Sequence, residues 1–188
     1  MRVITGTAKG KRLITPEGRD VTRPTGEKVK EGIFSSIQFL IEGADVLDLF
    51  AGSGQLGIEA LSRGAKSAVF VDSAKVAQKC ITENIKNCGF SDVAKLKTGD
   101  ALMYLSSAFE RFDIAFLDPP YAEVFLENSL KMITEIDILQ SGGIIVTERP
   151  VGKELPWNFE GFERSRDYKY GNTLLTIYRK TEKGETAL

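Results

Sequence analysis

The sequence predicts an α/β fold built on one mostly parallel sheet, and three observations support this. Between Asp45 and Thr147, short apolar runs alternate with longer segments whose apolar residues recur at helical spacing. The first apolar run leads into glycines at G-x-G-x-x-G spacing, Gly52 to Gly57, which are typical of a strand-to-helix corner. Two strand-like runs near the end predict an antiparallel hairpin at the sheet edge. Alternation of this kind favours a parallel sheet with helices on both faces.

The first part of the chain is expected to form a basic arm. Arg2–Ile4 and Lys11–Ile14 predict two short strands in a hairpin, and Thr25 is the expected N-cap of a helix that continues to Ile41 and ends at Gly43. We therefore divide the chain into an arm of residues 1–43, a main domain of residues 44–180 and a flexible tail of residues 181–188.

The main domain is predicted to contain seven strands and four helices. The predicted strands are Asp45–Phe50, Ser67–Val71, Ala94–Thr98, Asp113–Leu117, Ile144–Thr147, Phe162–Tyr168 and Leu174–Arg179. The predicted helices are Gln55–Arg63, Ala74–Cys88, Ala101–Phe109 and Val124–Ile136. Gly142-Gly143 is expected to form a turn, and residues 169–172 are expected to join the final hairpin.

Charge is unevenly distributed along the chain, whose net charge is only −1. Residues 1–30 hold eight Lys or Arg and three acidic residues, which leaves 17 basic and 23 acidic residues in the rest of the chain. A basic arm on an acidic body indicates contact with a polyanion, although a solvated charged face would give the same pattern.

Composition excludes several classes of protein and site. The chain has no histidine, so Ser-His and Cys-His catalytic pairs and histidine metal sites are excluded, and no metal is expected. Cys80 and Cys88 are interpreted as buried apolar residues of a protein in a reducing compartment. No apolar run approaches the roughly 20 residues that span a bilayer. The N-terminus lacks the apolar core of a signal peptide, so we expect a cytoplasmic protein with no membrane partner.

The glycine corner and three aspartates predict a site for a nucleotide-like ligand. Gly52 and Gly54 allow a ligand to approach the backbone, and Gly57 allows close packing of helix on strand. Asp72 ends the second strand and is expected to bind ribose hydroxyls, or alternatively to cap the next helix. Asp100 is expected to accept a hydrogen bond from an adenine amino group, with helix capping again the alternative. Asp48 is expected to meet an ammonium group or to fix the loop. These residues do not distinguish a dinucleotide from S-adenosylmethionine.

The motif Asp118-Pro119-Pro120-Tyr121 favours methyl transfer to an amino group. It follows the fourth strand of the alternation at the edge where ligands bind in open α/β sheets. The prolines remove two N–H donors and leave hydrogen-bond acceptors, the Asp118 carboxylate and the Pro119 carbonyl, which suit an exocyclic amino group. Tyr121 supplies a flat face for stacking a base, and Asp118 is the expected proton acceptor. The alternative is a rigid turn in which the Asp and Tyr have no such role.

These features resemble one protein family in order and spacing. The matching segments are MRVITGTAKGKRL, Arg23-Pro24-Thr25, EGIFSSI, DLFAGSGQLGIEALSRGA, FDIAFLDPPY and Tyr170-Gly171-Asn172-Thr173. The chain resembles the RsmD family of bacterial 16S rRNA (guanine-N2)-methyltransferases over about residues 1–179. Gln55, Thr5 and Ala74 depart from the residues that are usual in that family.

The resemblance implies a Rossmann-like class I methyltransferase fold with a mostly parallel seven-stranded sheet and a C-terminal antiparallel hairpin. It also implies S-adenosylmethionine as cofactor and 16S rRNA of the small ribosomal subunit as partner, and we expect a monomer. The expected cofactor-binding residues are Asp48, Phe50, Gly52, Ser53, Gly54, Gly57, Asp72, Asp100 and Ala101. The expected RNA-binding residues are Arg2, Lys9, Lys11, Arg12, Arg23 and Thr25.

Other functions remain compatible with parts of the pattern. An adenine-N6 or cytosine-N4 methyltransferase acting on DNA or RNA would use the same acceptor corner. A basic arm of about 40 residues can bind phosphates but is too small to recognise a sequence in duplex DNA, which argues against a DNA substrate. A structured RNA supplies specificity through its own shape. More distant alternatives are a nicotinamide-dependent oxidoreductase and a non-enzymatic RNA-binding ribosome assembly factor.

Overall fold

The computed structural model describes residues 1–16, 24–118, 123–152, 155–159 and 161–181. Its strands are β1 (Asp45–Leu49), β2 (Ser67–Asp72), β3 (Ala94–Thr98), β4 (Phe112–Leu117), β5 (Leu139–Pro150), β6 (Asn158–Phe159), β7 (Phe162–Tyr170) and β8 (Thr173–Lys180). Its helices are α1 (Pro24–Ser36), the 3₁₀ helix η1 (Gln38–Leu40), α2 (Gln55–Ser62), α3 (Lys75–Cys88), α4 (Ala101–Ser107) and α5 (Glu123–Ile136).

The strands form one mixed sheet in the order β3-β2-β1-β4-β5-β8-β7-β6. The five strands from β3 to β5 are parallel, and β8, β7 and β6 continue the sheet in antiparallel fashion. The predicted α/β class, the parallel sheet and the final hairpin are therefore confirmed. The two-residue β6 lies beyond the seven predicted strands at the edge of the sheet.

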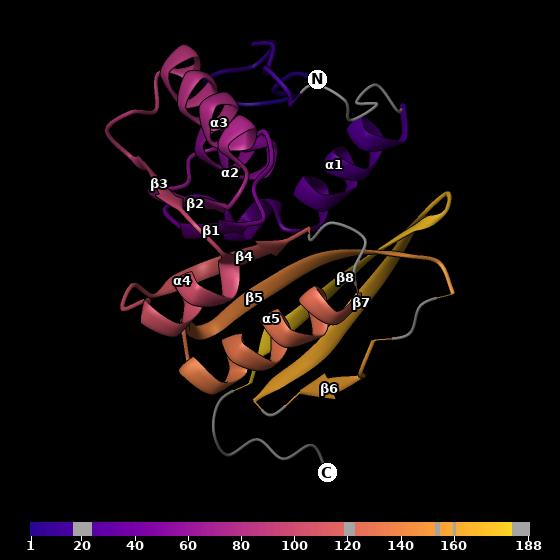
Figure 1. Ribbon diagram of the computed structural model, residues 1–188. Coiled ribbons are helices and arrows are strands. Elements are labelled where there is room, and N and C mark those ends of the chain that lie inside the picture. The colour runs from indigo at the N-terminus through magenta and orange to yellow at the C-terminus, as the bar shows by residue number, and fades with distance from the viewer. Residues whose placement is uncertain (17–23, 119–122, 153–154, 160, 182–188) are drawn as a thin grey trace.

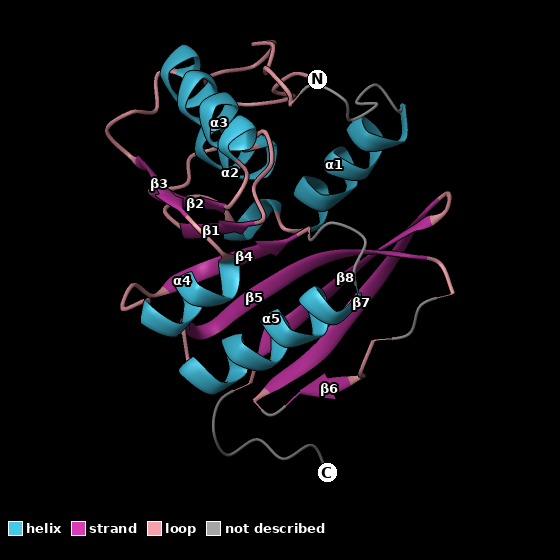
Figure 2. Cartoon of the chain, in the orientation of Figure 1, coloured by secondary structure: helices cyan, strands magenta, loops and turns pink. Residues whose placement is uncertain are grey.

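Helices cover both faces of the sheet, as Figures 1 and 2 show: α1, α2 and α3 lie over one face, and α4 and α5 lie over the other. Side chains alternate along each strand, so Val46, Phe116 and Val146 enter the core under the first group. Leu47 and Ile145 enter the core under the second group. Cys80 and Cys88 are buried free thiols, as expected.

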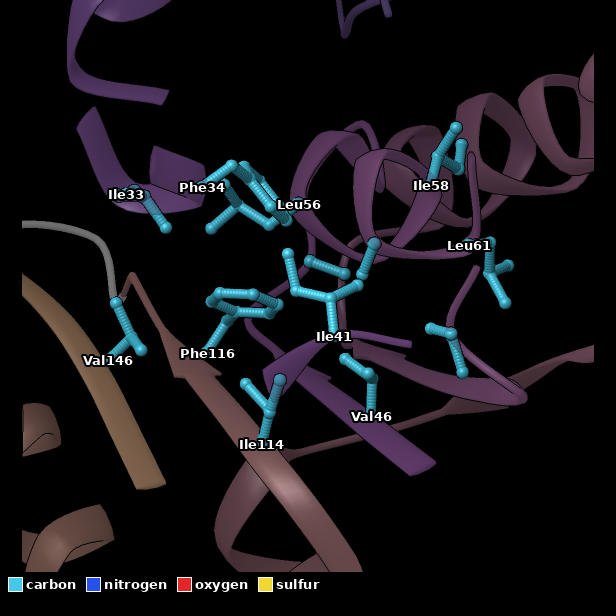
Figure 3. Packing of buried hydrophobic residues seen from close by; sticks show 14 of the residues in the cluster. Ile33, Phe34, Ile41, Val46, Leu56, Ile58, Leu61, Ile114, Phe116 and Val146 are labelled. Carbon is cyan, nitrogen blue, oxygen red and sulfur yellow. The ribbon is translucent and has the colours of Figure 1, made fainter. Parts of the chain in front are cut away.

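The core under α1 joins the arm to the sheet. The ring of Phe34 on α1 lies 5.6 Å from the ring of Phe116 on β4, and the surrounding aliphatic side chains are shown in Figure 3. Val3 and Leu13 of the arm belong to the same buried cluster. Burial of apolar surface therefore holds the arm on the main domain.

The predicted N-terminal hairpin is confirmed in outline but is shorter than expected. Arg2 and Arg12 form an antiparallel bridge, and the N–H groups of Val3 and Leu13 donate to the carbonyls of Lys11 and Met1 across it. The N–H groups of Ile4 and Thr5 donate to the Glu59 carboxylate on α2, so they are not available to extend a strand ladder.

The predicted first helix is also corrected. It begins at Pro24, which suits the first turn because its missing N–H would have no partner there. It ends at Ser36, whose hydroxyl donates to the Ile33 carbonyl, and the separate 3₁₀ helix follows before Gly43. Thr25 therefore lies within the helix rather than at its N-cap.

Gly142 and Gly143 do not form a turn before the fifth parallel strand. They lie inside β5, where Phe112 pairs with Leu139 but Ile114 pairs with Ile144, so the extra residues form a bulge. A Cβ atom at Gly143 would lie 2.9 Å from the Gln140 carbonyl oxygen, which explains the requirement for glycine there. The tail beyond Thr181 lies outside the described residues, and no described helix has the length and apolar character to cross a membrane.

Candidate active site

The glycine corner between β1 and α2 forms as predicted. Gly52 and Gly54 adopt φ angles of 61° and 75°, which glycine tolerates. A Cβ atom added at Gly52 would meet nothing within 4 Å, so this part of the loop is open to a ligand. A Cβ atom at Gly57 would lie 2.3 Å from the Phe70 ring, which confirms its role in close packing of helix on sheet.

Two other residues of the loop, Phe50 and Ser53, have a constrained backbone conformation and a buried hydrogen bond, respectively. Phe50 has a φ of 67°, a left-handed conformation that is uncommon for a non-glycine residue and often occurs near functional sites. Ser53 is buried, and its carbonyl accepts a hydrogen bond of 2.9 Å from the Asn84 side chain on α3.

Asp48 fixes the loop to the end of β1. Its side chain is only 2% exposed, and its Oδ2 accepts the Gly57 N–H at 2.9 Å. Burial raises the pKa of Asp48 to about 8, the Gly57 N–H opposes this rise, and the negative charges of Asp118 and Asp72 add to it. In the free protein at neutral pH this carboxyl group is therefore mostly protonated.

Asp72 also contacts the glycine loop. Its Oδ2 accepts the Gly52 N–H and its Oδ1 accepts the Ala74 N–H, both at 2.8 Å. Because Ala74 occupies the N-cap of α3, the predicted capping alternative for Asp72 is wrong.

Asp100 is the N-cap of α4. Its Oδ1 accepts the N–H groups of Leu102 and Met103, so the capping alternative is confirmed for this residue. Ala101 begins the helix and is buried. Contact of Asp100 with an adenine stays a prediction.

Asp118 is the only residue of its motif that the structure describes, because Pro119, Pro120 and Tyr121 lie outside the described residues. It is exposed at the carboxyl end of β4. Its charge raises the pKa of both Asp48 on β1 and Glu148 on β5, which indicates that it lies near both strands. The carboxyl ends of three neighbouring strands thus bring acidic side chains to one edge of the sheet.

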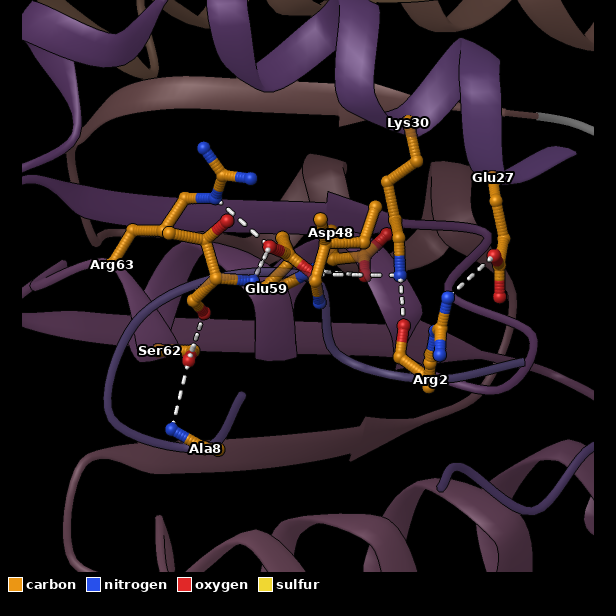
Figure 4. A network of polar contacts seen from close by, with 11 residues as sticks. Arg2, Ala8, Glu27, Lys30, Asp48, Glu59, Ser62 and Arg63 are labelled. Atoms are coloured by element: carbon orange, nitrogen blue, oxygen red, sulfur yellow. Dashed lines mark hydrogen bonds and ion pairs between the residues drawn. The ribbon is translucent and has the colours of Figure 1, made fainter. Parts of the chain in front are cut away.

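A buried ionic network attaches the arm to α2 (Figure 4). Glu59 is fully buried, lies 2.9 Å from Arg63 Nε and lies 3.4 Å from Lys30 Nζ. Lys30 also donates to the Arg2 carbonyl at 2.7 Å, and burial lowers its pKa while Glu59 opposes that change. Lys30 was counted with the basic arm, but its buried ammonium group serves the fold rather than a polyanion.

The other predicted RNA-binding residues differ in their surroundings. Arg2, Lys9, Lys11 and Arg12 are exposed. Arg2 lies 3.8 Å from Glu27, and Lys11 donates to the Asn87 carbonyl at the end of α3. Arg23 lies outside the described residues, as does the side chain of Thr25. Contact with RNA stays a prediction for this whole group.

Three residues of the site region were missed from the sequence. Glu59 and Asn84 are polar residues on otherwise apolar helix faces, which is the signal that could have indicated buried hydrogen-bonding roles. Glu148 directly follows the predicted strand Ile144–Thr147, and the rule that selected the aspartates at strand ends would also have selected it.

Comparisons with known proteins agree with this arrangement. A family model described as "Conserved hypothetical protein 95" matches residues 1–179. "Putative rRNA methyltransferase YlbH" of Bacillus subtilis is 42% identical over 183 residues, covering 96% of this chain and 99% of that protein. "Ribosomal RNA small subunit methyltransferase D" of Escherichia coli is 28% identical over 186 residues, covering 99% and 93%. The solved structure of "Putative methyltransferase yhhF from Escherichia coli" has a TM-score of 0.87 at 28% identity, covering 96% and 98%.

Proposed function

Because this chain belongs to the Conserved hypothetical protein 95 family, we propose that it is an rRNA methyltransferase of the RsmD type. It transfers the methyl group of S-adenosylmethionine to the N2 amino group of one guanine in 16S rRNA of the small ribosomal subunit. The observation that carries this proposal is the parallel register of β1 and β4, in which Leu49 pairs with Leu117, so that Asp118 follows β4 beside the glycine corner that follows β1. We place the reaction in the cytoplasm and infer that the protein acts as a monomer.

The glycine corner fits S-adenosylmethionine on two observations. The loop is open at Gly52, and Gln55 Oε1 is buried without a hydrogen-bond partner among the described residues, so a donor group of a ligand would satisfy it. We assign cofactor binding to Asp48, Phe50, Gly52, Ser53, Gly54, Gly57, Asp72, Asp100 and Ala101. When bound, S-adenosylmethionine supplies an electrophilic methyl group on a sulfonium sulfur.

Asp118 orients and deprotonates the amino group. The lone pair of an aryl amine is delocalised into the ring, so the amine is a weak nucleophile. Accepting its N–H groups at Asp118 and at the carbonyl of Pro119 localises that lone pair, and Asp118 takes the proton that leaves. Pro120 keeps the corner rigid, and Tyr121 stacks on the base.

The arm holds the RNA by its phosphates. Exposed Lys9 and Arg12 lie on a segment attached to α2 and α3, so they would present positive charge from a fixed surface. Arg2, Lys11, Arg23 and Thr25 complete the proposed contact. The pI near 5.7 predicts weak binding to nucleic acid in general, which fits an enzyme that acts on one assembled particle.

Transfer of labelled methyl to small ribosomal subunits that lack the modification tests this function. Digestion to nucleosides is expected to release the label as N2-methylguanosine. Label in N6-methyladenosine or N4-methylcytidine would contradict the guanine assignment. The absence of label in RNA, with cofactor binding shown by thermal shift, would favour a non-enzymatic assembly factor.

A further inference from the structure

Glu148 lies beside Asp118 in the sheet. Leu117 of β4 pairs in parallel register with Thr147 of β5, and Asp118 and Glu148 are the residues that follow this pair. On the other side Glu148 pairs with Leu175 of β8. Glu148 therefore lies where the pairing of β5 with β4 ends, next to Asp118, although β5 itself continues to Pro150.

Side-chain alternation puts both carboxyl groups on the same face of the sheet. Phe116 and Val146, each two residues earlier, belong to the core under α1, as does the paired Leu175. Asp48, which pairs with Phe116 across β1 and β4, also falls on that face. Asp48, Asp118 and Glu148 consequently share one face at the same edge.

Electrostatics supports this proximity. Burial raises the pKa of Glu148 to about 8, and the negative charge of Asp118 adds to the rise. Among the described residues, no cation forms an ion pair with the Glu148 carboxylate. In the free protein at neutral pH this carboxyl group is therefore mostly protonated, and a ligand that donates a hydrogen bond to it favours its charged form.

Guanine differs from the other amino bases in the atom beside its amino group. The N2 amino group of guanine is flanked by N1–H, which is a donor. The N6 amino group of adenine is flanked by N1, and the N4 amino group of cytosine by N3, and both of these ring atoms are acceptors. In its charged form, a second carboxylate next to Asp118 would accept a hydrogen bond from the N1–H of guanine but would repel the ring lone pair of adenine or cytosine.

We propose that Glu148 selects guanine by accepting the N1–H of the target base while Asp118 holds its N2 amino group. This inference rests on the proposed function, which it deepens by assigning the choice of base to a residue outside the Asp-Pro-Pro-Tyr motif. Glu148 acts as a specificity residue at the site, and Asp118 remains the proton acceptor.

The test compares guanine with 2-aminopurine at the target position of 16S rRNA assembled into small subunits. The analogue keeps the N2 amino group but has an acceptor at N1. The wild-type enzyme is expected to prefer guanine by about 10- to 100-fold in kcat/KM, as for one well-placed base contact. Glu148→Met is expected to reduce this preference to a few-fold, mainly by slowing the reaction of guanine.

Two controls keep this result interpretable. The ratio of kcat/KM values for two substrates does not depend on the fraction of enzyme that is folded, so loss of stability in Glu148→Met would not change it. Glu148→Gln keeps a carbonyl acceptor for the N1–H of guanine but adds an N–H donor for the N1 acceptor of 2-aminopurine, so it is expected to react with both substrates and to lose most of the preference. Glu163→Met makes the same substitution at an exposed residue of β7, which pairs with Arg179 of β8. This variant is expected to leave the ratio of kcat/KM for guanine and 2-aminopurine unchanged.

The two proposals fail in different ways. An unchanged preference in Glu148→Met, with guanine still methylated at N2, would overturn the assignment of Glu148 and leave the proposed function in place. No methylation of guanine subunits by the wild-type enzyme would overturn the proposed function itself, and the assignment of Glu148 with it.

Discussion

Burial holds Asp48 in a protonation state that a free aspartate does not adopt at neutral pH. Its pKa of about 8 in the folded protein lies far above the ordinary value of 3.8, because burial disfavours the charged form. Between about pH 4 and pH 8 the folded protein therefore keeps a proton that the unfolded chain releases. The contribution of Asp48 to the free energy of unfolding should fall as pH rises through this window and level off above it, by on the order of 6 kcal/mol at 1.4 kcal/mol per pKa unit. Glu148, whose pKa burial also raises to about 8, should add a fall in the same window.

Asp48→Asn should remove the Asp48 part of this dependence and leave the part that Glu148 contributes. The amide has no charge to desolvate, and its oxygen can still accept the Gly57 N–H, so the variant should melt at a higher temperature than wild type at pH 8. The difference should shrink toward pH 4, as measured by thermal unfolding across that range. The matched control is Asp92→Asn, at an exposed loop position. A difference in melting temperature that is the same at both pH values would contradict the account.

Individual residues also show where prediction from sequence succeeds. Strand-end aspartates could be selected because ligands in open α/β sheets bind at the carboxyl ends of strands, and the family resemblance rested on contiguous motifs. The capping alternative is confirmed for Asp100 and wrong for Asp72. The sequence does not separate the two cases, because helix capping and ligand binding both use a carboxylate just before a helix. The surrounding backbone decides the outcome: Asp72 accepts the Gly52 N–H of the neighbouring loop, whereas Asp100 accepts N–H groups of the helix that it begins.

At the scale of elements, one side chain of α3, Asn84, connects the arm to the glycine corner. Asn84 is fully buried, accepts the Ile14 N–H at 2.7 Å, and donates to the carbonyls of Ile14 at 2.8 Å and Ser53 at 2.9 Å. A buried amide with all these bonds made fixes the two segments relative to each other.

Asn84→Ala should weaken both the fold and the cofactor site. Three backbone groups would lose their partner, which should lower the free energy of unfolding by about 1–3 kcal/mol. We also expect weaker binding of S-adenosylhomocysteine by calorimetry, because the Ser53 carbonyl is no longer held. Thr82→Ala on the exposed side of the same helix is the control. Loss of stability with unchanged cofactor affinity would show that the bond to Ser53 does not position the loop.

Elements with regular hydrophobic periods were predicted well, whereas irregular ones were not. β1 and α3 follow clear apolar patterns, and their predicted bounds agree within one residue at each end. The N-terminal hairpin follows from local pattern, but its length does not, because the N–H groups of Ile4 and Thr5 bond to Glu59, which lies 55 residues from Ile4 along the chain. The glycine pair in β5 resembles a turn in sequence, and only pairing with β4 turns it into a bulge.

At the scale of the whole molecule, the arm carries an excess of basic residues and the rest of the chain carries an excess of acidic residues. The arm does not form a separate domain, because it shares a hydrophobic core with the sheet and a buried ionic network with α2. The division at residue 43 thus remains a proposal about RNA contact.

Removal of charge from the arm should change how RNA binding depends on salt. Lys9→Gln with Arg12→Gln should weaken binding to small subunits and lower the slope of log affinity against log salt by about 1.5, at 0.7–0.9 per phosphate contact. The measurement is a binding titration at several salt concentrations. Lys66→Gln with Lys131→Gln, two exposed lysines outside the arm, removes the same charge and should leave the slope unchanged. Equal slopes in both double variants would contradict a specific RNA contact by the arm.

The central claim is that Asp118 receives the amino group of guanine at the edge formed by β1, β4 and β5. The most direct measurement is single-turnover methyl transfer by Asp118→Asn on unmodified small subunits, with N2-methylguanosine as the product followed. We expect the rate to fall by about 10²–10⁴-fold, because the asparagine cannot take the proton. Binding of S-adenosylhomocysteine and the melting temperature should stay close to wild type. Full turnover by this variant would contradict the account.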